Sequence, residues 1–239
     1  MIKFVVLSLF NDSFESFLNS SIIKRSINSN KLSVKLIDIR DFSKFKNKKV
    51  DDTPYGGGTG MLLKVDVMER AIENAKCKMQ NAKLRNINYN DQTIRRSVDP
   101  TVVLLTPQGE KFTAKMAKEL AGKEQLILIC GHYEGFDERI REHLVDKQVS
   151  IGDYVLTGGE LPAMIMIDAI SRFVPGVLPV GAPDEDSHSI DIEGKPALEY
   201  PQYTKPAVFN GWKVPDVLIS GNHAKIDQWK KDNLKPASN

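Results

Sequence analysis

The stretch Gln125-Leu126-Ile127-Leu128-Ile129-Cys130-Gly131-His132-Tyr133-Glu134-Gly135 carries the pattern that decides the fold, an apolar run that ends at a glycine loop. Continuous apolar runs of this length are typical of parallel strands covered on both faces. Residues 101–105 form a second run before Thr106-Pro107-Gln108-Gly109, and residues 149–151 precede a third loop, Gly152-Asp153-Tyr154-Val155-Leu156-Thr157-Gly158-Gly159. We call residues 106–109, 131–135 and 152–159 the first, second and third loops.

Between the apolar runs, the spacing of the apolar residues becomes helical. It predicts helices over residues 112–120 and 161–173, with Pro162 tolerated in the first turn of the latter. Nearer the N-terminus we expect strands over residues 4–10 and 32–39 and helices over 14–27 and 61–75, with a capping box formed by Asp12 and Glu15. This alternation predicts an α/β fold with a mainly parallel sheet and helices on both faces.

Composition limits the class of protein. The 239 residues are 41% apolar and 27% charged, as in ordinary globular proteins, and the net charge of +2 restricts any nucleic-acid surface to a local patch. Cys77 and Cys130 form neither a disulfide framework nor a metal-ligand pattern. The apolar run 4–10 is too short to span a bilayer, so we expect a soluble, cytoplasmic protein with no membrane association.

The chain is expected to contain two domains. Residues 1–178 carry the alternating pattern, residues 179–196 are rich in proline and carboxylates and indicate a linker, and residues 197–239 form a small domain with a helix near 224–231. The polar, basic stretch 77–99 is either a solvated insertion or an RNA-contacting arm.

The three loops predict a binding pocket. In open parallel sheets, ligands bind outside the carboxyl ends of the strands, and glycine lets main chain approach a ligand closely. Any one loop alone is compatible with an ordinary turn, but three together, with Tyr133 and Tyr154 among them, indicate a pocket walled mainly by main chain.

A fourth, glycine-rich segment precedes a predicted helix. This segment, Tyr55-Gly56-Gly57-Gly58-Thr59-Gly60, is either a phosphate cradle or a hinge. It lacks the Gly-Lys-Ser/Thr ending of a P-loop, and no dinucleotide-binding fingerprint follows a strand. We call residues 56–60 the triple-glycine loop.

The longer motifs resemble a known family. The second loop continues as Phe136-Asp137-Glu138-Arg139 and the third as Glu160-Leu161-Pro162-Ala163. With Arg172-Phe173-Val174-Pro175-Gly176-Val177-Leu178, Glu185-Asp186-Ser187, Tyr203-Thr204-Lys205-Pro206 and Ser220-Gly221-Asn222-His223, they are similar to the TrmD family of bacterial tRNA (guanine-N1)-methyltransferases, part of the SPOUT superfamily. The resemblance covers the chain except for residues 77–99 and the middle of the linker.

This resemblance implies several properties that spacing alone does not. It implies a deep C-terminal trefoil knot, a small helical C-terminal domain, and a homodimer with the active site at the subunit interface. It implies S-adenosylmethionine as methyl donor and N1 of guanine 37 in tRNA, bound through the anticodon branch, as acceptor. The family is reported to need magnesium, whose ligands the sequence does not place, so no metal ligand is predicted.

The resemblance also assigns residues. Asp186 is the residue expected to accept the N1 proton. Arg172 is expected to stabilise the negative charge that develops on O6 of the guanine. Ser187, Glu199, Gly57 and Gly58 are expected at the substrate, although the family has aspartate at position 199 and usually proline at position 59. The expected cofactor pocket consists of Leu104, Leu105, Thr106, Pro107, Gln108, Gly109, Gly131, Tyr133, Glu134, Ile151, Gly152, Asp153, Tyr154, Val155, Leu156, Gly158, Gly159 and Pro162.

Three other functions are considered. A related enzyme that methylates a ribose hydroxyl would not need the carboxylate of Asp186. A non-catalytic RNA-binding module need not bind the cofactor. A nucleotide hydrolase that uses the triple-glycine loop would bind ATP or GTP.

Overall fold

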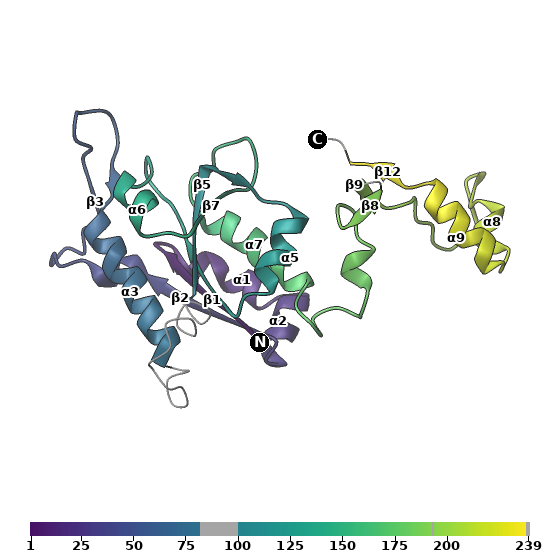
Figure 1. Cartoon of the computed structure of the whole chain (residues 1–239), viewed down its shortest axis with the longest axis horizontal. Coiled ribbons are helices and arrows are strands. Elements are labelled where there is room, and N and C mark those ends of the chain that lie inside the picture. The colour runs from purple at the N-terminus through teal and green to yellow at the C-terminus, as the bar shows by residue number, and fades with distance from the viewer. Residues whose placement is uncertain (82–99, 193, 238–239) are drawn as a thin grey trace. The chain divides into compact units, whose positions relative to one another are not determined.

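The computed structural model describes residues 1–81, 100–192 and 194–237 (Figure 1). The chain divides into two compact units, Met1–Leu178 and Pro179–Asn239, which we describe separately. Most of the basic stretch 77–99, including the proposed RNA-contacting arm, lies outside the described residues.

The first unit is built on a parallel sheet of five strands in the order β2-β1-β6-β5-β7. The strands are β1 (Ile2–Ser8), β2 (Leu32–Asp38), β5 (Thr101–Lys111), β6 (Gln125–Ile129) and β7 (Lys147–Ser150). Every pairing in this sheet is parallel, so the carboxyl ends of β5, β6 and β7 lie at one edge. The predicted mainly parallel α/β sheet is confirmed.

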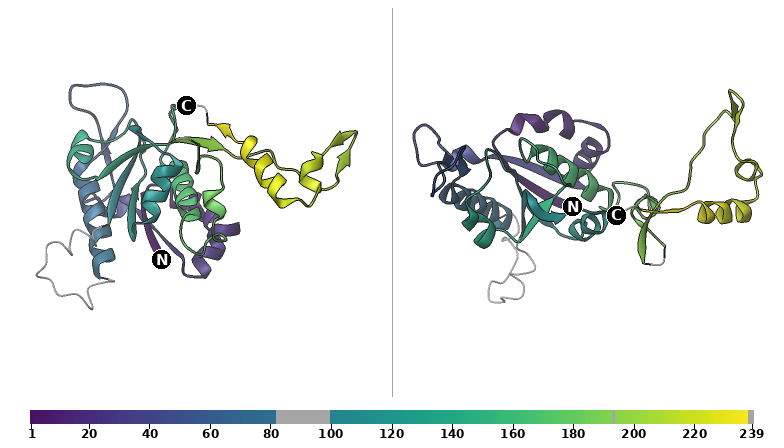
Figure 2. Two further views of the ribbon diagram at one scale, coloured as in Figure 1. Left: turned by 45° about the vertical axis from the view of Figure 1, so that its right-hand side comes forward. Right: turned by 90° about the horizontal axis from the view of Figure 1, so that it is seen from above.

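Helices cover both faces of this sheet, as predicted. The buried side chains form one cluster that includes α2 (Ser21–Asn28), α5 (Ala114–Ala121) and α7 (Glu160–Arg172). A second cluster includes α3 (Val65–Asn81) and α6 (Glu138–His143). The left view of Figure 2 shows α3 on one side of the strands and α5 and α7 on the other.

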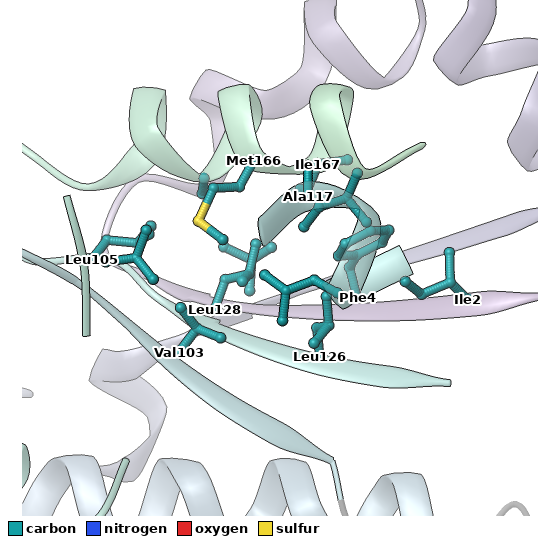
Figure 3. Close-up of a cluster of buried hydrophobic side chains, with 14 of the residues drawn as sticks. Ile2, Phe4, Val103, Leu105, Ala117, Leu126, Leu128, Met166 and Ile167 are labelled. Atoms are coloured by element: carbon teal, nitrogen blue, oxygen red, sulfur yellow. The ribbon is translucent and has the colours of Figure 1, made fainter. Parts of the chain in front are cut away.

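The continuous apolar runs in the sequence follow from this double cover. Successive side chains of a strand point to opposite faces. In β1, Phe4 and Val6 pack into the cluster with α7, whereas Val5 and Leu7 pack into the cluster with α3. Figure 3 shows the first of these clusters, where Leu105, Leu128 and Met166 are among the labelled side chains.

Some local predictions were wrong. The expected helix over 14–27 is divided into a 3₁₀ turn (Asn11–Phe14), α1 (Glu15–Leu18) and α2, and the predicted cap at Asp12 does not form because the 3₁₀ turn begins before it. The helix expected from residue 61 starts at Val65, because residues 62 and 63 form β4 (Leu62–Leu63), which pairs with β3 (Asp51–Asp52). A second 3₁₀ turn, Ile39–Phe42, follows β2.

The first loop is a bulge inside a strand rather than a turn after one. Leu105 and Glu110 both pair with Val149 of β7, so residues 106–109 project from the ladder while β5 continues to Lys111. Gly109 returns the chain to the ladder, where a side chain does not fit: a Cβ there would lie 2.4 Å from the Val149 nitrogen. The bulge thus presents the first loop at the edge of the sheet.

The second unit contains little regular structure. A 3₁₀ turn (Ala182–Asp184) precedes a three-stranded antiparallel sheet of β8 (Ile190–Ile192), β9 (Lys195–Leu198) and β12 (Lys235–Pro236). The remaining elements are the hairpin of β10 (Val208–Phe209) and β11 (Trp212–Lys213), and the helices α8 (Asp216–Ile219) and α9 (His223–Asp232). The stretch expected to be a linker therefore includes β8 and the start of β9. Ala197 is the only buried residue among those described in this unit.

Candidate functional site

A cavity of about 440 Å³ opens at the edge where β5, β6 and β7 end. Its walls come from the three glycine-containing loops, together with the start of α7 and the side of α6. The sequence predicted this convergence, because the carboxyl ends of neighbouring parallel strands meet at one edge. The predicted cofactor residues that line the cavity are Leu105, Thr106, Pro107, Gln108, Gly131, Tyr133, Glu134, Ile151, Tyr154, Val155, Leu156, Gly158, Gly159 and Pro162.

Four predicted cofactor residues do not line the cavity. Leu104 is fully buried in the core cluster that contains α3. Gly109 packs against the β7 backbone, and Gly152 lies beneath the Tyr154 ring. Asp153 points to solvent and forms an ion pair of 2.7 Å with Lys111. Gly109, Gly152 and Asp153 therefore belong to the loops without lining the cavity, and Leu104 belongs to the core.

Two glycines of the wall leave no room for a side chain. A Cβ on Gly159 would lie 2.5 Å from the Cys130 Cα and 2.6 Å from the Gly131 nitrogen. A Cβ on Gly131 would lie 2.8 Å from the Phe136 ring. The Gly159 N–H donates to the Gly131 carbonyl at 2.8 Å, which joins the third loop to the second. At these two positions the wall has no space for a side chain.

The cavity also includes an arginine that the sequence did not point to. Asp137 caps α6 by accepting a hydrogen bond from the Arg139 N–H, and one turn later Arg141 faces the cavity. The Arg141 guanidinium donates from Nε and Nη2 to Gln148 Oε1 at 2.9 and 2.8 Å, and from Nη1 to Gln108 Oε1. Arg141 thereby holds the first loop against β7.

The other lining residues that were not predicted are neighbours of predicted ones. They are His132, Gly135, Phe136, Glu138, Val149, Ser150 and Thr157. Adjacency to the loops was the available signal for most of them, whereas Glu138 lies on α6, a helix that the sequence pattern did not predict.

The second loop carries a small aromatic cluster at the mouth of the cavity. The His132 ring lies 4.9 Å from Phe10 and 5.0 Å from Tyr133 between centroids, and His132 Nδ1 is buried without a hydrogen-bond partner. Tyr133 adopts a left-handed φ of 60°. Burial, aided by the carboxylate of Asp51, raises the pKa of the Tyr133 hydroxyl, so this group stays protonated at neutral pH.

A buried polar contact ties the third loop to the core. Glu160, at the start of α7, accepts a hydrogen bond of 2.7 Å from the Ser8 hydroxyl at the end of β1. Both side chains are buried. Burial, together with the charge of Glu160, raises the pKa of the Cys130 thiol well above its ordinary value. The first residue of α7 is thus fixed to the end of β1.

The segment that follows the triple-glycine loop contacts the second loop through main chain. The Leu63 N–H donates to Gly135 at 2.9 Å, and the Glu134 N–H donates to Met61 at 3.1 Å. Gly60 has a φ of +89°, and a Cβ there would lie 2.2 Å from Glu134 Cγ. Gly57 and Gly58, which were predicted to contact substrate, are exposed and have positive φ values.

The remaining predicted residues are divided between the two units. Arg172 is the last residue of α7 in the first unit, whereas Asp186, Ser187 and Glu199 belong to the second. The structure brings Ser187 and Glu199 together: the Glu199 N–H donates to Ser187 Oγ at 3.1 Å, and that hydroxyl donates to Glu199 Oε1 at 3.4 Å. Gln202 holds the other Glu199 carboxylate oxygen at 2.5 Å.

Neither a cluster of metal ligands nor a membrane-spanning helix occurs in the part of the chain that the structure describes. Within residues 1–81, 100–192 and 194–237, no group of three or more His, Cys, Asp or Glu side chains is arranged to hold a metal ion. In the same residues, no helix has both the length and the apolar character needed to cross a bilayer.

The fold and the cavity define the class: an α/β protein with a cavity lined by glycine-containing loops at the carboxyl edge of a parallel sheet. Residues 2–237 match the family model described as tRNA (Guanine-1)-methyltransferase TrmD. The chain therefore belongs to this family, as the sequence motifs predicted.

Individual relatives agree with this assignment. A protein of Dehalococcoides mccartyi is 48% identical over 237 residues, which cover 98% of this chain and 86% of the relative. Proteins of Bacillus pumilus and Listeria innocua are each 47% identical over 234 residues, covering 98% of this chain and 87% of each relative. All three are named tRNA (guanine-N(1)-)-methyltransferase.

Proposed function

We propose that this protein transfers a methyl group from S-adenosylmethionine to N1 of guanine 37 in tRNA. The observation that carries the proposal is the main-chain cavity at the carboxyl edge of the sheet, in a chain that matches the methyltransferase family from residue 2 to residue 237. A tRNA substrate also implies that the protein acts in the cytoplasm.

The residues of the cavity fit this cofactor. Gly131 and Gly159 place main chain without a side chain at the cavity, and Leu105 and Leu156 offer apolar contacts to the faces of an adenine. Arg141 fixes the first loop through Gln108. When bound, the cofactor supplies an electrophilic methyl group on its sulfonium.

The chemistry at guanine requires removal of a proton. Guanine N1 is protonated at neutral pH, so it becomes nucleophilic only when a base accepts that proton within about 2.6–3.2 Å. We assign this base to the carboxylate of Asp186. Negative charge then grows on O6 of the guanine, and a cation placed there lowers the barrier. We assign that role to the guanidinium of Arg172.

Substrate contacts are assigned from both units. In the second unit, hydrogen bonds join Ser187, which follows Asp186 in the sequence, to Glu199, and we assign both side chains to contact with the guanine. In the first unit, Gly57 and Gly58 offer exposed main chain to the same base. Residues 179–196 would connect the domains, and residues 197–239 would bind the anticodon branch.

The family properties of knot and dimer complete the proposal. The trefoil knot is proposed from the family, and the hydrogen bond from Gly159 to Gly131 shows the second and third loops in contact. Leu161 and Ile165 are one turn apart on α7 and remain 59% and 46% exposed, and Val155 is 80% exposed. An apolar stripe of this kind supports a homodimer that completes the active site.

Transfer of tritium from labelled S-adenosylmethionine tests the function. An unmodified tRNA with guanine at position 37 should accept label at N1, and the same tRNA with adenine at that position should not. Asp186→Asn should reduce the rate by about 10²–10⁴-fold, the usual contribution of a general base, while calorimetry shows unchanged cofactor affinity. Asp184→Asn, which removes an exposed acid two residues away, is the matched control.

The same experiment separates the other functions. Label on a ribose hydroxyl, with normal turnover by Asp186→Asn, would identify a ribose methyltransferase. Absence of both cofactor binding and transfer would identify an RNA-binding module without catalytic activity.

A further inference from the structure

The second unit carries a hairpin that the proposed chemistry does not use. Asn210-Gly211 is the preferred pair for a two-residue hairpin loop, which requires positive φ at both positions. The structure has φ values of +50° at Asn210 and +83° at Gly211. β10 and β11 pair on either side, and Phe209 lies opposite Trp212. The sequence therefore dictates a local hairpin that displays two aromatic rings side by side.

These rings are exposed to solvent. Every residue from 201 to 213 is exposed, and Phe209 and Trp212 are 56% and 72% exposed. Their centroids lie 6.0 Å apart with a tilt of 58°. A two-stranded hairpin alone is marginally stable in water, and apolar surface of this kind marks a site of interaction. The hairpin is therefore expected to be covered when the protein acts.

The charge around the rings identifies what covers them. Lys205 and Lys213 are the only charged residues between Glu199 and Asp216 in the sequence, so this segment is purely cationic. Lys213 is paired with Val208 in the hairpin itself. Cores of protein–protein interfaces are depleted in lysine, whereas single-stranded nucleic acid is bound by aromatic rings that stack on bases and by cations that contact phosphates.

We propose that the hairpin of residues 208–213 is a stacking platform for unpaired nucleotides of the substrate tRNA. Phe209 and Trp212 contact base faces, and Lys213 contacts a phosphate. Stacking accepts any base, so this surface contributes affinity and orientation while the guanine is selected elsewhere. The inference rests on the proposed tRNA substrate and adds a specific contact surface to it.

The fluorescence of Trp212 reports on this contact directly. The chain has two tryptophans, and Trp229→Phe leaves Trp212 as the only one while keeping a ring against Tyr200 and Tyr203. In this variant, an unmodified tRNA transcript should quench the fluorescence saturably, whereas a fully paired RNA duplex should not. Absence of quenching at saturating tRNA would overturn the proposal.

Substitutions give the size of the effect. Trp212→Ala should weaken tRNA binding about 5- to 150-fold, as stacked aromatics do, and Trp212→Phe should retain most of the affinity. Ile219→Ala is the matched control, because Ile219 is an apolar side chain of similar exposure, 60%, outside the hairpin. Equal binding by Trp212→Ala and Ile219→Ala would refute the stacking role.

Salt dependence separates the two kinds of contact. Lys213→Ala should reduce the slope of log affinity against log salt by about 0.7, the value for one phosphate contact on a single strand, and Trp212→Ala should leave the slope unchanged. If Lys213→Ala and Trp212→Ala changed the salt-dependence slope by the same amount, the assignment of Lys213 to a phosphate and Trp212 to a base would be wrong.

The remaining outcome is a second copy of this chain on the hairpin. Concentration-dependent quenching of Trp212 without RNA, or dissociation of an oligomer by Trp212→Ala in sedimentation, would refute the proposal in favour of a subunit contact. Failure of the proposed function is distinct from these results: wild-type protein would then transfer no methyl group to tRNA, whatever the behaviour of Trp212.

Discussion

The sharpest prediction concerns the contact between Gly159 and the second loop. In Gly159→Ala, the new Cβ would lie 2.5 Å from the Cys130 Cα and 2.6 Å from the Gly131 nitrogen. Carbon atoms rest at about 3.5–4.0 Å, so the two backbone segments must separate by roughly 1 Å. The distance from the Gly159 nitrogen to the Gly131 carbonyl oxygen, now 2.8 Å, then exceeds hydrogen-bonding range.

The expected magnitude follows from these two losses. Overpacking costs about 1–3 kcal/mol, and a lost backbone hydrogen bond adds about 1 kcal/mol. At about 2–4 °C per kcal/mol, the midpoint of thermal unfolding should fall by roughly 4–16 °C. Because the displaced segments form the cavity wall, the Kd for S-adenosylmethionine should rise at least about tenfold, which corresponds to about 1.4 kcal/mol.

Circular dichroism during heating and calorimetric titration measure both effects. Gly122→Ala is the matched control, since Gly122 also has a right-handed φ, −74° against −85° for Gly159, and its nearest contact is 3.3 Å. Backbone strain is thereby excluded as the cause of any difference. If Gly159→Ala had the same melting temperature as Gly122→Ala and the same cofactor Kd as wild type, the close contact at Gly159 would contribute neither to stability nor to cofactor binding.

Three further predictions concern the supports of the cavity. Ser8→Ala removes the hydroxyl that donates to Glu160 at 2.7 Å, and the free energy of unfolding in urea should fall by about 1–3 kcal/mol. An unchanged urea midpoint would show that the buried Glu160 carboxylate does not need this hydrogen bond. Arg141→Lys should raise the cofactor Kd about tenfold in calorimetry, because a lysine cannot reproduce the planar fork that holds Gln108, and wild-type affinity would refute this. Burial raises the pKa of Cys130, so its contribution to stability is complete below the unfolded-state pKa of about 8.5 and is lost as the pH rises towards the folded pKa. Unfolding free energy from pH 7 to 10 should therefore decline more steeply in wild type than in Cys130→Ala, and parallel curves would contradict this.

The features of the fold that could be predicted from sequence are those that leave a pattern within a single strand. The runs 101–105 and 125–130 are apolar without alternation because both faces of the sheet are covered, and this pattern is local. The division of the first helical segment was missed because the 3₁₀ turn at Asn11–Phe14 depends on burial of Phe14 against the sheet. The bulge at residues 106–109 was missed because it is defined by the register with β7.

The same distinction applies to the site. Glycine in the loops could be recognised in sequence because close approach of main chain leaves glycine as the residue that fits, and fourteen predicted cofactor residues line one cavity. Arg141 was missed because its partners Gln108 and Gln148 are brought to it by the fold, at sequence separations of 33 and 7. Side-chain partnerships of this kind leave no periodic trace in the chain.

The proposed cofactor-binding residues and the proposed catalytic residues differ in how well sequence predicts them, because the first act through main chain and the second through particular side chains. Under the proposed function, main-chain groups, which every residue carries, bind the cofactor, so glycine is the available sequence signal, as at Gly131 and Gly159. Proton removal from guanine needs a carboxylate, and the developing charge needs a cation, so those roles select for particular side chains. Asp186 and Arg172 stand in different units, and neither is distinguished by local pattern from other charged residues. Methyl transfer by the wild-type protein, with loss in Asp186→Asn and intact cofactor binding, would therefore separate the main-chain site from the chemistry that depends on it.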